Sequence, residues 1–187
     1  QTVGQHGFAP FAGLGPYDNL YVDDIPTIEF FERMVPVFDL WKRGGTWEHV
    51  HPWMETVLPW DRAPDMMEAI LPDLPPSILV GGHVLLWPAK GKTSRSRLFM
   101  RPPGENLMGF GILPGVPPDL LPQAKGRLNM LSDMSMAAGG KRYLSGFIEF
   151  DGPRWRQHFG TQWEAIRALK KTFDPDGILN PGFIDYA

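Results

Sequence analysis

The run of turn residues at 173–183 constrains this 187-residue chain more than any other stretch. Its segment 174–177, Asp-Pro-Asp-Gly, suits a type I turn, because Asp favours the first position, Pro presets φ at the second and Gly favours the fourth. Its segment 180–182, Asn-Pro-Gly, predicts a second turn, in which the proline pushes the asparagine out of the right-handed α region. We therefore expect a C-terminal clamp that holds Ile178 and Leu179 between two turns and pins the last residues to a core.

Apolar periodicity and the positions of the prolines predict a series of helices before these turns. The first begins with Thr27 as its N-cap and ends or kinks at Pro36. The last begins with a capping box, in which Thr161 and Glu164 satisfy each other's backbone groups. The expected helices or helical turns span about residues 27–35, 63–71, 120–136, 153–160 and 161–172. Glycines and prolines scattered through residues 1–26 predict an extended connector instead.

Short apolar runs predict the strands, which span about residues 47–58, 77–88, 98–100 and 107–113. Pro52 interrupts the first strand, and Gly81-Gly82 marks a bulge, a bend or a close backbone approach in the second. Strands and helices come mixed, with short links and no βαβ rhythm. This order favours an α+β fold, with an antiparallel sheet flanked by helices.

Composition excludes several classes of protein. Hydrophobic residues make up 43% of the chain and charged residues 21%, which is ordinary for one globular domain. A net charge of −3 without a basic block argues against nucleic-acid binding, and the absence of cysteine excludes a disulfide scaffold and thiol catalysis. No apolar run is long enough to predict a membrane span. The localisation stays unknown, and because the chain begins at Gln1 without a leader, we expect a processed product or a fragment.

Motifs of nucleotide-binding and hydrolytic enzymes are missing from the sequence: it has no G-x-G-x-x-G, no phosphate-binding loop and no G-x-S-x-G. The pair His49-x-His51 could bind a metal if His83 or Glu55 supplied a third ligand, which would indicate a metal hydrolase. No recognised ligand spacing completes such a set, so these histidines are better explained as structural, and no metal is assigned. From residue patterns alone, the sequence indicates a globular α+β domain and no more.

A resemblance carries the argument further. Residues 173–182, Phe-Asp-Pro-x-Gly-Ile-Leu-Asn-Pro-Gly, resemble the C-terminal signature of FAD-linked oxidases of the vanillyl-alcohol oxidase type. Upstream, the chain resembles one branch of that group, the cytokinin dehydrogenases, over roughly residues 20–186. The runs that carry this second resemblance are Phe31–Met34, Gly45–Glu48, His51-Pro52-Trp53, 78–88, Lys141-x-Tyr143-Leu144, Trp155-x-x-His158-Phe159-Gly160 and Trp163.

The resemblance implies that residues 27–172 form a substrate or cap domain, with 1–26 as connector and 173–187 as a return segment toward an FAD domain. That domain would bind most of the FAD and would supply the acid–base residue. It lies outside this chain, so no catalytic residue is identifiable here. We expect the chain to need an N-terminal FAD-binding domain or subunit as its partner, and to be inactive alone. The full protein would oxidise a small amine or alcohol by hydride transfer to flavin, and a homo-oligomer is compatible with this expectation.

The resemblance also nominates site residues. We expect substrate to contact Trp53, Glu55, Trp87, Tyr143 and Leu144. Tyr143, Asn180 and Phe183 would contact the cofactor, with Tyr143 and Leu144 facing the isoalloxazine. The alternative is that these aromatic and apolar side chains simply fill the core.

Four departures from the family pattern point to a different substrate, such as an apolar or aromatic alcohol or amine. Glu55 replaces an asparagine, Trp87 a tyrosine and Phe183 a glutamine, while an expected glutamate falls at Val37 or Phe38. An alternative function is a non-catalytic binding or subunit module that keeps the cap fold without the flavin domain.

Overall fold

The computed structural model describes residues 24–79, 81–92, 96 and 98–186. The chain divides into two compact units, residues 1–44 and residues 45–187. The connector predicted for residues 1–26 lies almost wholly outside the described residues.

The described part of the first unit consists of two short helices, α1 (Thr27–Glu32) and α2 (Val35–Arg43). The first helix ends before Pro36, as predicted. The proline itself lies in the first turn of α2, where proline is favoured. The predicted N-cap is wrong, because Pro26 occupies that position and makes no side-chain cap. Phe31 is 71% exposed and Ile28 66%, so α1 presents apolar side chains to solvent.

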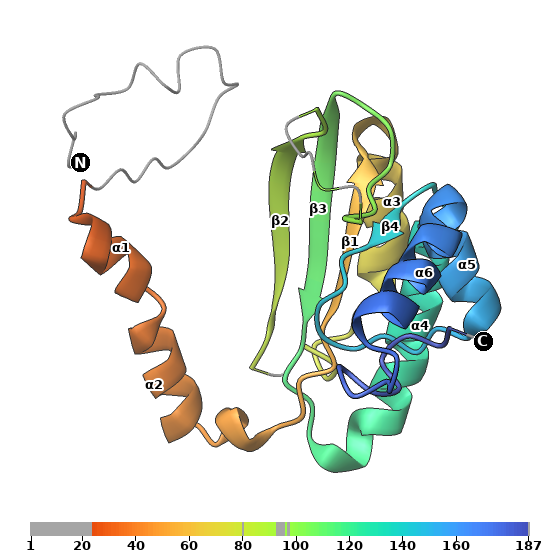
Figure 1. The fold of residues 1–187 in the computed structure, drawn as a ribbon. Coiled ribbons are helices and arrows are strands. Elements are labelled where there is room, and N and C mark those ends of the chain that lie inside the picture. The colour runs from red at the N-terminus through yellow and green to blue at the C-terminus, as the bar shows by residue number, and fades with distance from the viewer. Residues whose placement is uncertain (1–23, 80, 93–95, 97, 187) are drawn as a thin grey trace. The chain divides into compact units, whose positions relative to one another are not determined.

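The second unit is built on a four-stranded antiparallel sheet (Figure 1). Its strands are β1 (Met54–Pro59), β2 (His83–Lys90), β3 (Asn106–Leu113) and β4 (Lys141–Arg142), in the spatial order β2-β3-β1-β4. The predicted α+β class with an antiparallel sheet flanked by helices is thus confirmed.

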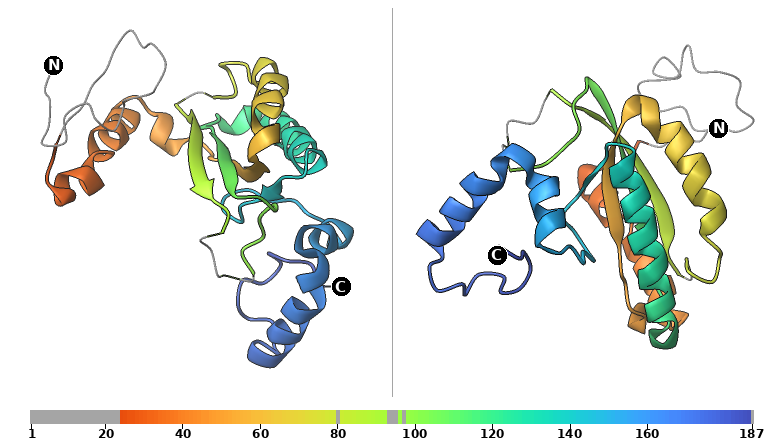
Figure 2. Two further views of the ribbon diagram at one scale, coloured as in Figure 1. Left: turned by 90° about the horizontal axis from the view of Figure 1, so that it is seen from above. Right: turned by 90° about the vertical axis from the view of Figure 1, so that its right-hand side faces the viewer.

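Two helices, α3 (Ala63–Ile70) and α4 (Leu121–Ala137), cover one face of this sheet (Figure 2, right). Both occur close to where the apolar periodicity predicts them. Since successive strand residues point to opposite faces, the core takes alternate positions of β1 and β3. Its buried members are Met54, Leu58, Ala63, Met66, Ile70, Leu74, Phe110, Ile112, Leu128 and Leu131. Full burial of each large side chain contributes about 1.5–3 kcal/mol.

A second apolar cluster forms around α5 (Gly152–Phe159) and α6 (Trp163–Phe173). Trp155, Phe159, Trp163 and Ile166 are its buried members. Asp151 caps α5 by accepting a hydrogen bond from the Arg154 N–H at 2.9 Å. The predicted capping box is absent, because residues 160–162 form a 3₁₀ turn and α6 begins without a side-chain cap.

Three predicted strand segments are wrong. Residues 46–48 form a 3₁₀ helix and Val50 makes only an isolated bridge with Val116. Residues 77–79 and 81 form turns and a bend, and residues 98 and 99 form bends. β1 begins only after Pro52, and β2 begins only after Gly81, which has a φ of 67°. Among the described residues, the 3₁₀ helices are Thr46–Glu48, Trp60–Arg62, Leu71–Asp73, Pro118–Leu120 and Gly160–Gln162.

Both C-terminal turns are present. The N–H of Gly177 donates to Asp174 O at 3.1 Å, the N–H of Phe183 donates to Asn180 O at 3.2 Å, and Asn180 has φ 48°. The side chains between the turns are not held in a core, however: Ile178 is 75% exposed and Leu179 59%. Instead Ile184 and Tyr186, beyond the second turn, pin the segment to the second cluster.

Candidate functional site

The face of the sheet opposite α3 and α4 brings together three of the predicted site residues. Glu55 pairs with Gly111 and Trp87 with Gly109, so these positions alternate with the strand residues that enter the core. The N–H of Tyr143, just after β4, donates to Glu55 O at 3.0 Å and continues the same row. We call the surface of Glu55, Trp87, Gly109, Gly111 and Tyr143 the glycine face.

Gly109 and Gly111, which have no side chain, shape the glycine face. A Cβ on Gly109 would overlap the indole of Trp87. A Cβ on Gly111 would lie 3.4 Å from Trp87 Cζ3 and 3.3 Å from Glu55 Cγ. The indole therefore lies flat along β3 from one glycine to the other, and the side chains of Trp87 and Glu55 converge over Gly111.

Tyr143 closes the far side of this arrangement. Its ring meets Trp87 edge to face at 6.4 Å between centroids and meets Phe99 at 5.6 Å. Such pairs contribute about 0.5–1.5 kcal/mol beyond their buried area. Tyr143 remains 40% exposed, so these two ring contacts do not bury it.

A buried cation supports the site from behind. Arg142 is 2% exposed and makes hydrogen bonds to Glu55 O at 2.9 Å, Ser132 Oγ at 3.0 Å and Phe147 O at 2.8 Å. Burial lowers the pKa of Arg142 to about 10, while the charge of Glu55 opposes that shift. Because its donors bridge β1, α4 and the loop after β4, Arg142 fixes the backbone at Glu55 and Tyr143.

Ser145 fixes the Glu55 side chain directly, because its hydroxyl donates to Glu55 Oε2. Sequence reasoning missed both Ser145 and Arg142. The only available signal for Arg142 was its position between Lys141 and Tyr143 in a run that resembles the family. Nothing in the sequence marked Ser145.

The other two predicted substrate residues lie beside this group. Trp53 is half-buried, and its carbonyl accepts from the Phe147 N–H at 2.9 Å. Its indole Nε1 is buried and makes no hydrogen bond. Leu144 packs against the second cluster with Trp155, so this side chain also serves the core.

The predicted cofactor residues Asn180 and Phe183 belong to a different part of the unit. Together with Pro181 and Gly182 they line a shallow open pocket in the return segment. The Phe183 ring packs against Trp155 of α5 at 5.9 Å and is 39% exposed. Their role toward a cofactor remains a prediction.

The histidine pair does not lie on a strand. His49 Nδ1 is 3.2 Å from Gly115 O, within hydrogen-bond distance when this nitrogen carries the proton. His51 stacks edge to face with Trp53 at 6.1 Å. Across the part of the chain that the structure describes, no group of three or more His, Cys, Asp or Glu could hold a metal ion.

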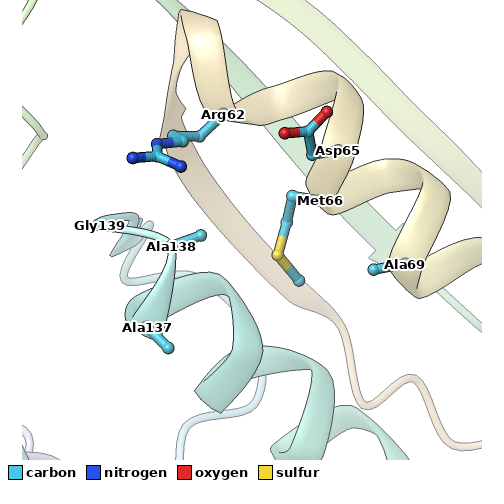
Figure 3. Close-up of a pocket in the computed structure, with 7 residues that line it drawn as sticks. All are labelled: Arg62, Asp65, Met66, Ala69, Ala137, Ala138 and Gly139. Carbon is cyan, nitrogen blue, oxygen red and sulfur yellow. The ribbon is translucent and has the colours of Figure 1, made fainter.

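A pocket also occurs behind the sheet, between α3 and the end of α4 (Figure 3). Its lining residues are Arg62, Asp65, Met66, Ala69, Ala137, Ala138 and Gly139. None of the predicted site residues contributes to it, and it lies on the helix-covered side of the sheet. Among the described helices, none is both long and apolar enough to cross a membrane.

Comparison with known proteins gives consistent matches. A family model described as "Cytokinin dehydrogenase 1, FAD and cytokinin binding" matches residues 16–184. Cytokinin dehydrogenase 5 of Oryza sativa subsp. japonica is 30% identical over 173 residues, which cover 87% of this chain and 32% of the relative. Cytokinin dehydrogenase 6 of the same plant is 25% identical, covering 87% and 31%. An uncharacterized oxidoreductase from the fasciation locus of Rhodococcoides fascians is 24% identical, covering 87% and 37%. The chain thus spans about a third of these relatives' length.

Proposed function

Because the chain belongs to the family of FAD- and cytokinin-binding domains of cytokinin dehydrogenases, we propose that it is the substrate-binding portion of an FAD-dependent oxidoreductase. In this proposal the assembled protein oxidises a small amine or alcohol by hydride transfer to flavin. Trp53, Glu55, Trp87, Tyr143 and Leu144 would contact the substrate. The chain would act only together with an FAD-binding domain or subunit.

The observation that carries this proposal is the glycine face. A carboxylate and two aromatic rings converge on one partly exposed face of the sheet, above two residues without side chains. Aromatic walls with one precisely held polar group are typical of small-molecule sites. Glu55 would orient the substrate, while Trp87 and Tyr143 would bind its apolar part and exclude water.

The residues present also fit a flavin. Tyr143 is 40% exposed and follows a strand fixed by Arg142, so it offers a rigid aromatic edge to a planar ring. Asn180 and Phe183 line an open pocket whose backbone the second C-terminal turn holds. FAD, when bound, supplies the hydride acceptor. The residues of this chain bind and orient the substrate against it.

The test is anaerobic reduction of the complete protein. The reading frame that contains this chain is expressed in full, together with any separately encoded flavin subunit. We expect a yellow protein whose visible flavin absorbance bleaches when one of a panel of N6-substituted adenines, aromatic amines and aromatic alcohols is added. The variant Trp87→Ala should raise KM for that substrate more than it lowers kcat.

The opposite result is equally clear. A colourless protein that takes up no FAD, with or without a subunit, would contradict the proposal. It would favour the alternative of a non-catalytic binding module that has kept the fold.

A further inference from the structure

Glu55 differs from its neighbours on the glycine face because it is the charged side chain at the point where they converge. One of its carboxylate oxygens, Oε2, accepts the Ser145 hydroxyl. Its backbone carbonyl accepts both the Tyr143 N–H at 3.0 Å and Arg142 Nε at 2.9 Å. The residue is therefore held from three sides, and its carboxylate is fixed in direction as well as in position.

An ionised carboxylate can only accept hydrogen bonds. Ser145 satisfies part of that capacity, and a ligand that packs on Trp87 and Tyr143 would meet the rest. A ligand group that faces Glu55 must therefore be a donor. An acceptor in the same place would lose its hydrogen bond to water without gaining another, which costs more than the bond itself would contribute.

We propose that Glu55 is a specificity-determining residue that selects aromatic ligands with a hydrogen-bond donor, N–H or O–H, beside the ring, and that Ser145 is its positioning residue. This inference rests on the proposed function for the location of the ligand, and it adds the chemical class. Ligands with a carbonyl, ether or methyl group in the same place are rejected.

The aromatic rings explain why selection at this point is sharp. Trp87 cannot move toward β3 without meeting the Gly109 and Gly111 backbone, and its edge meets Tyr143 at 6.4 Å. A planar ligand held against these rings has little freedom to turn its polar group away from Glu55. Geometry of this kind converts one hydrogen bond into discrimination between otherwise similar ligands.

The experiment uses a pair of matched neutral probes, benzamide and acetophenone. They have the same shape and differ by an NH₂ group in place of a methyl group. Dissociation constants are measured on the complete protein from the change in tryptophan fluorescence, without turnover. We expect benzamide to bind at least about tenfold more tightly than acetophenone, as a hydrogen bond to a charged acceptor implies.

The variant Glu55→Gln keeps the shape but adds a donor. It should weaken the binding of benzamide and strengthen the binding of acetophenone, so that the ratio of the two dissociation constants falls by about tenfold. Glu68→Gln is the matched control, since it removes the same charge from an exposed position on α3, behind the sheet. It should leave the preference unchanged.

Ser145 is tested by its effect on the same ratio. Ser145→Ala should reduce the preference for benzamide, and Ser145→Thr, which keeps the hydroxyl, should restore it. A general loss of structure would weaken the binding of both probes equally, and threonine would not restore it.

Equal binding of both probes by the unaltered protein, or a ratio that Glu55→Gln leaves unchanged, would overturn the inference. Because binding is measured without catalysis, these results are independent of whether the flavin bleaches with any substrate. A protein that shows the preference but never reduces flavin would contradict the proposed function and keep the role of Glu55.

Discussion

Gly109 shows how one residue shapes the site by what it lacks. The Trp87 indole occupies the space that any Cβ at this position would need. The position therefore requires glycine for its small size and not for its backbone angles, because the φ of Gly109 is not in the left-handed region.

We predict that Gly109→Ala lowers the free energy of unfolding by about 1–3 kcal/mol, because the added methyl forces the indole out of its place. It should also weaken benzamide binding. Urea unfolding followed by tryptophan fluorescence measures the first effect. Gly126→Ala is the matched control: Gly126 is exposed in α4 and its Cβ would meet nothing within 4 Å. That change should stabilise by about 0.5–1 kcal/mol, and equal losses in both variants would contradict the argument.

His158 makes a second prediction at this scale. The ring is fully buried, both of its nitrogens lack a hydrogen-bond partner, and Phe150, Trp155 and Phe159 surround it. Burial, aided by the charges of Lys141 and Arg142, lowers its pKa from 6.5 to about 4. As pH falls, the unfolded chain therefore takes up the proton first.

The free energy of unfolding therefore takes no penalty from His158 above pH 6.5, and it falls progressively as the pH is lowered toward about 4. The loss amounts to about 3 kcal/mol at most. We expect His158→Phe to flatten this part of the pH profile, measured by urea unfolding between pH 7 and pH 4.5. Comparing slopes removes any difference in stability at pH 7. An unchanged slope would show that other groups control the acid response.

At the scale of elements, the first C-terminal turn depends on one carboxylate. Asp174 accepts from Lys170 Nζ, from the Ile178 N–H at 2.9 Å and from the Leu179 N–H at 3.0 Å. It joins the end of α6 to the return segment, although the apolar side chains of that segment are exposed.

We therefore predict that Asp174→Ala speeds hydrogen exchange of the Ile178 and Leu179 amides by roughly tenfold, while exchange within α6 changes less. Asp176→Ala, an exposed change in the same turn, is the control. Hydrogen exchange followed by NMR measures each amide. If both variants exchange alike, the carboxylate is not what holds the turn.

The same scale shows which elements a sequence specifies. α3, α4 and β3 were predictable because their periodicity agrees with the face that they bury, as at Ala124, Leu128 and Leu131. The strand predicted over residues 47–53 failed because tryptophan and valine have high strand propensity wherever they lie, and here only Val50 makes an isolated bridge, with Val116. The capping box failed because Gly160, with φ 53°, starts a 3₁₀ turn in its place.

At the scale of the whole molecule, several large apolar side chains are exposed to water, which is unfavourable unless something covers them. Phe173 is 76% exposed and Ile178 75% within the second unit. Large exposed apolar groups mark interfaces or a tendency to associate. If the proposed function holds, the FAD-binding partner would cover those of the return segment.

We predict that the chain alone associates at micromolar concentration, and that the double variant Phe173→Ser with Ile178→Ser shifts it toward the monomer. Size-exclusion chromatography with light scattering measures the mass. Lys171→Ser, an exposed polar change in the same helix, should leave the mass unchanged. A monomer at all concentrations would contradict the prediction.

The site was predictable only in part at this scale. Glu55, Trp87 and Tyr143 were nominated by resemblance, but that they share a face with two glycines follows from strand register, which depends on contacts far apart in sequence. Ser145 and Arg142 both make a hydrogen bond to Glu55, which lies 90 and 87 positions away in the sequence. No local pattern carries such information.

The glycine face has a consequence for how this protein can diverge. A single base substitution converts any glycine codon to an alanine codon, so Gly109 and Gly111 are each one mutational step from a reshaped ligand surface. The steps differ in severity, because a methyl at Gly109 displaces an indole, whereas a methyl at Gly111 would meet its neighbours at 3.1–3.4 Å. Gly111 is therefore the position where selection can adjust ligand preference gradually, and Gly109 the position where it can only keep or abandon the present arrangement.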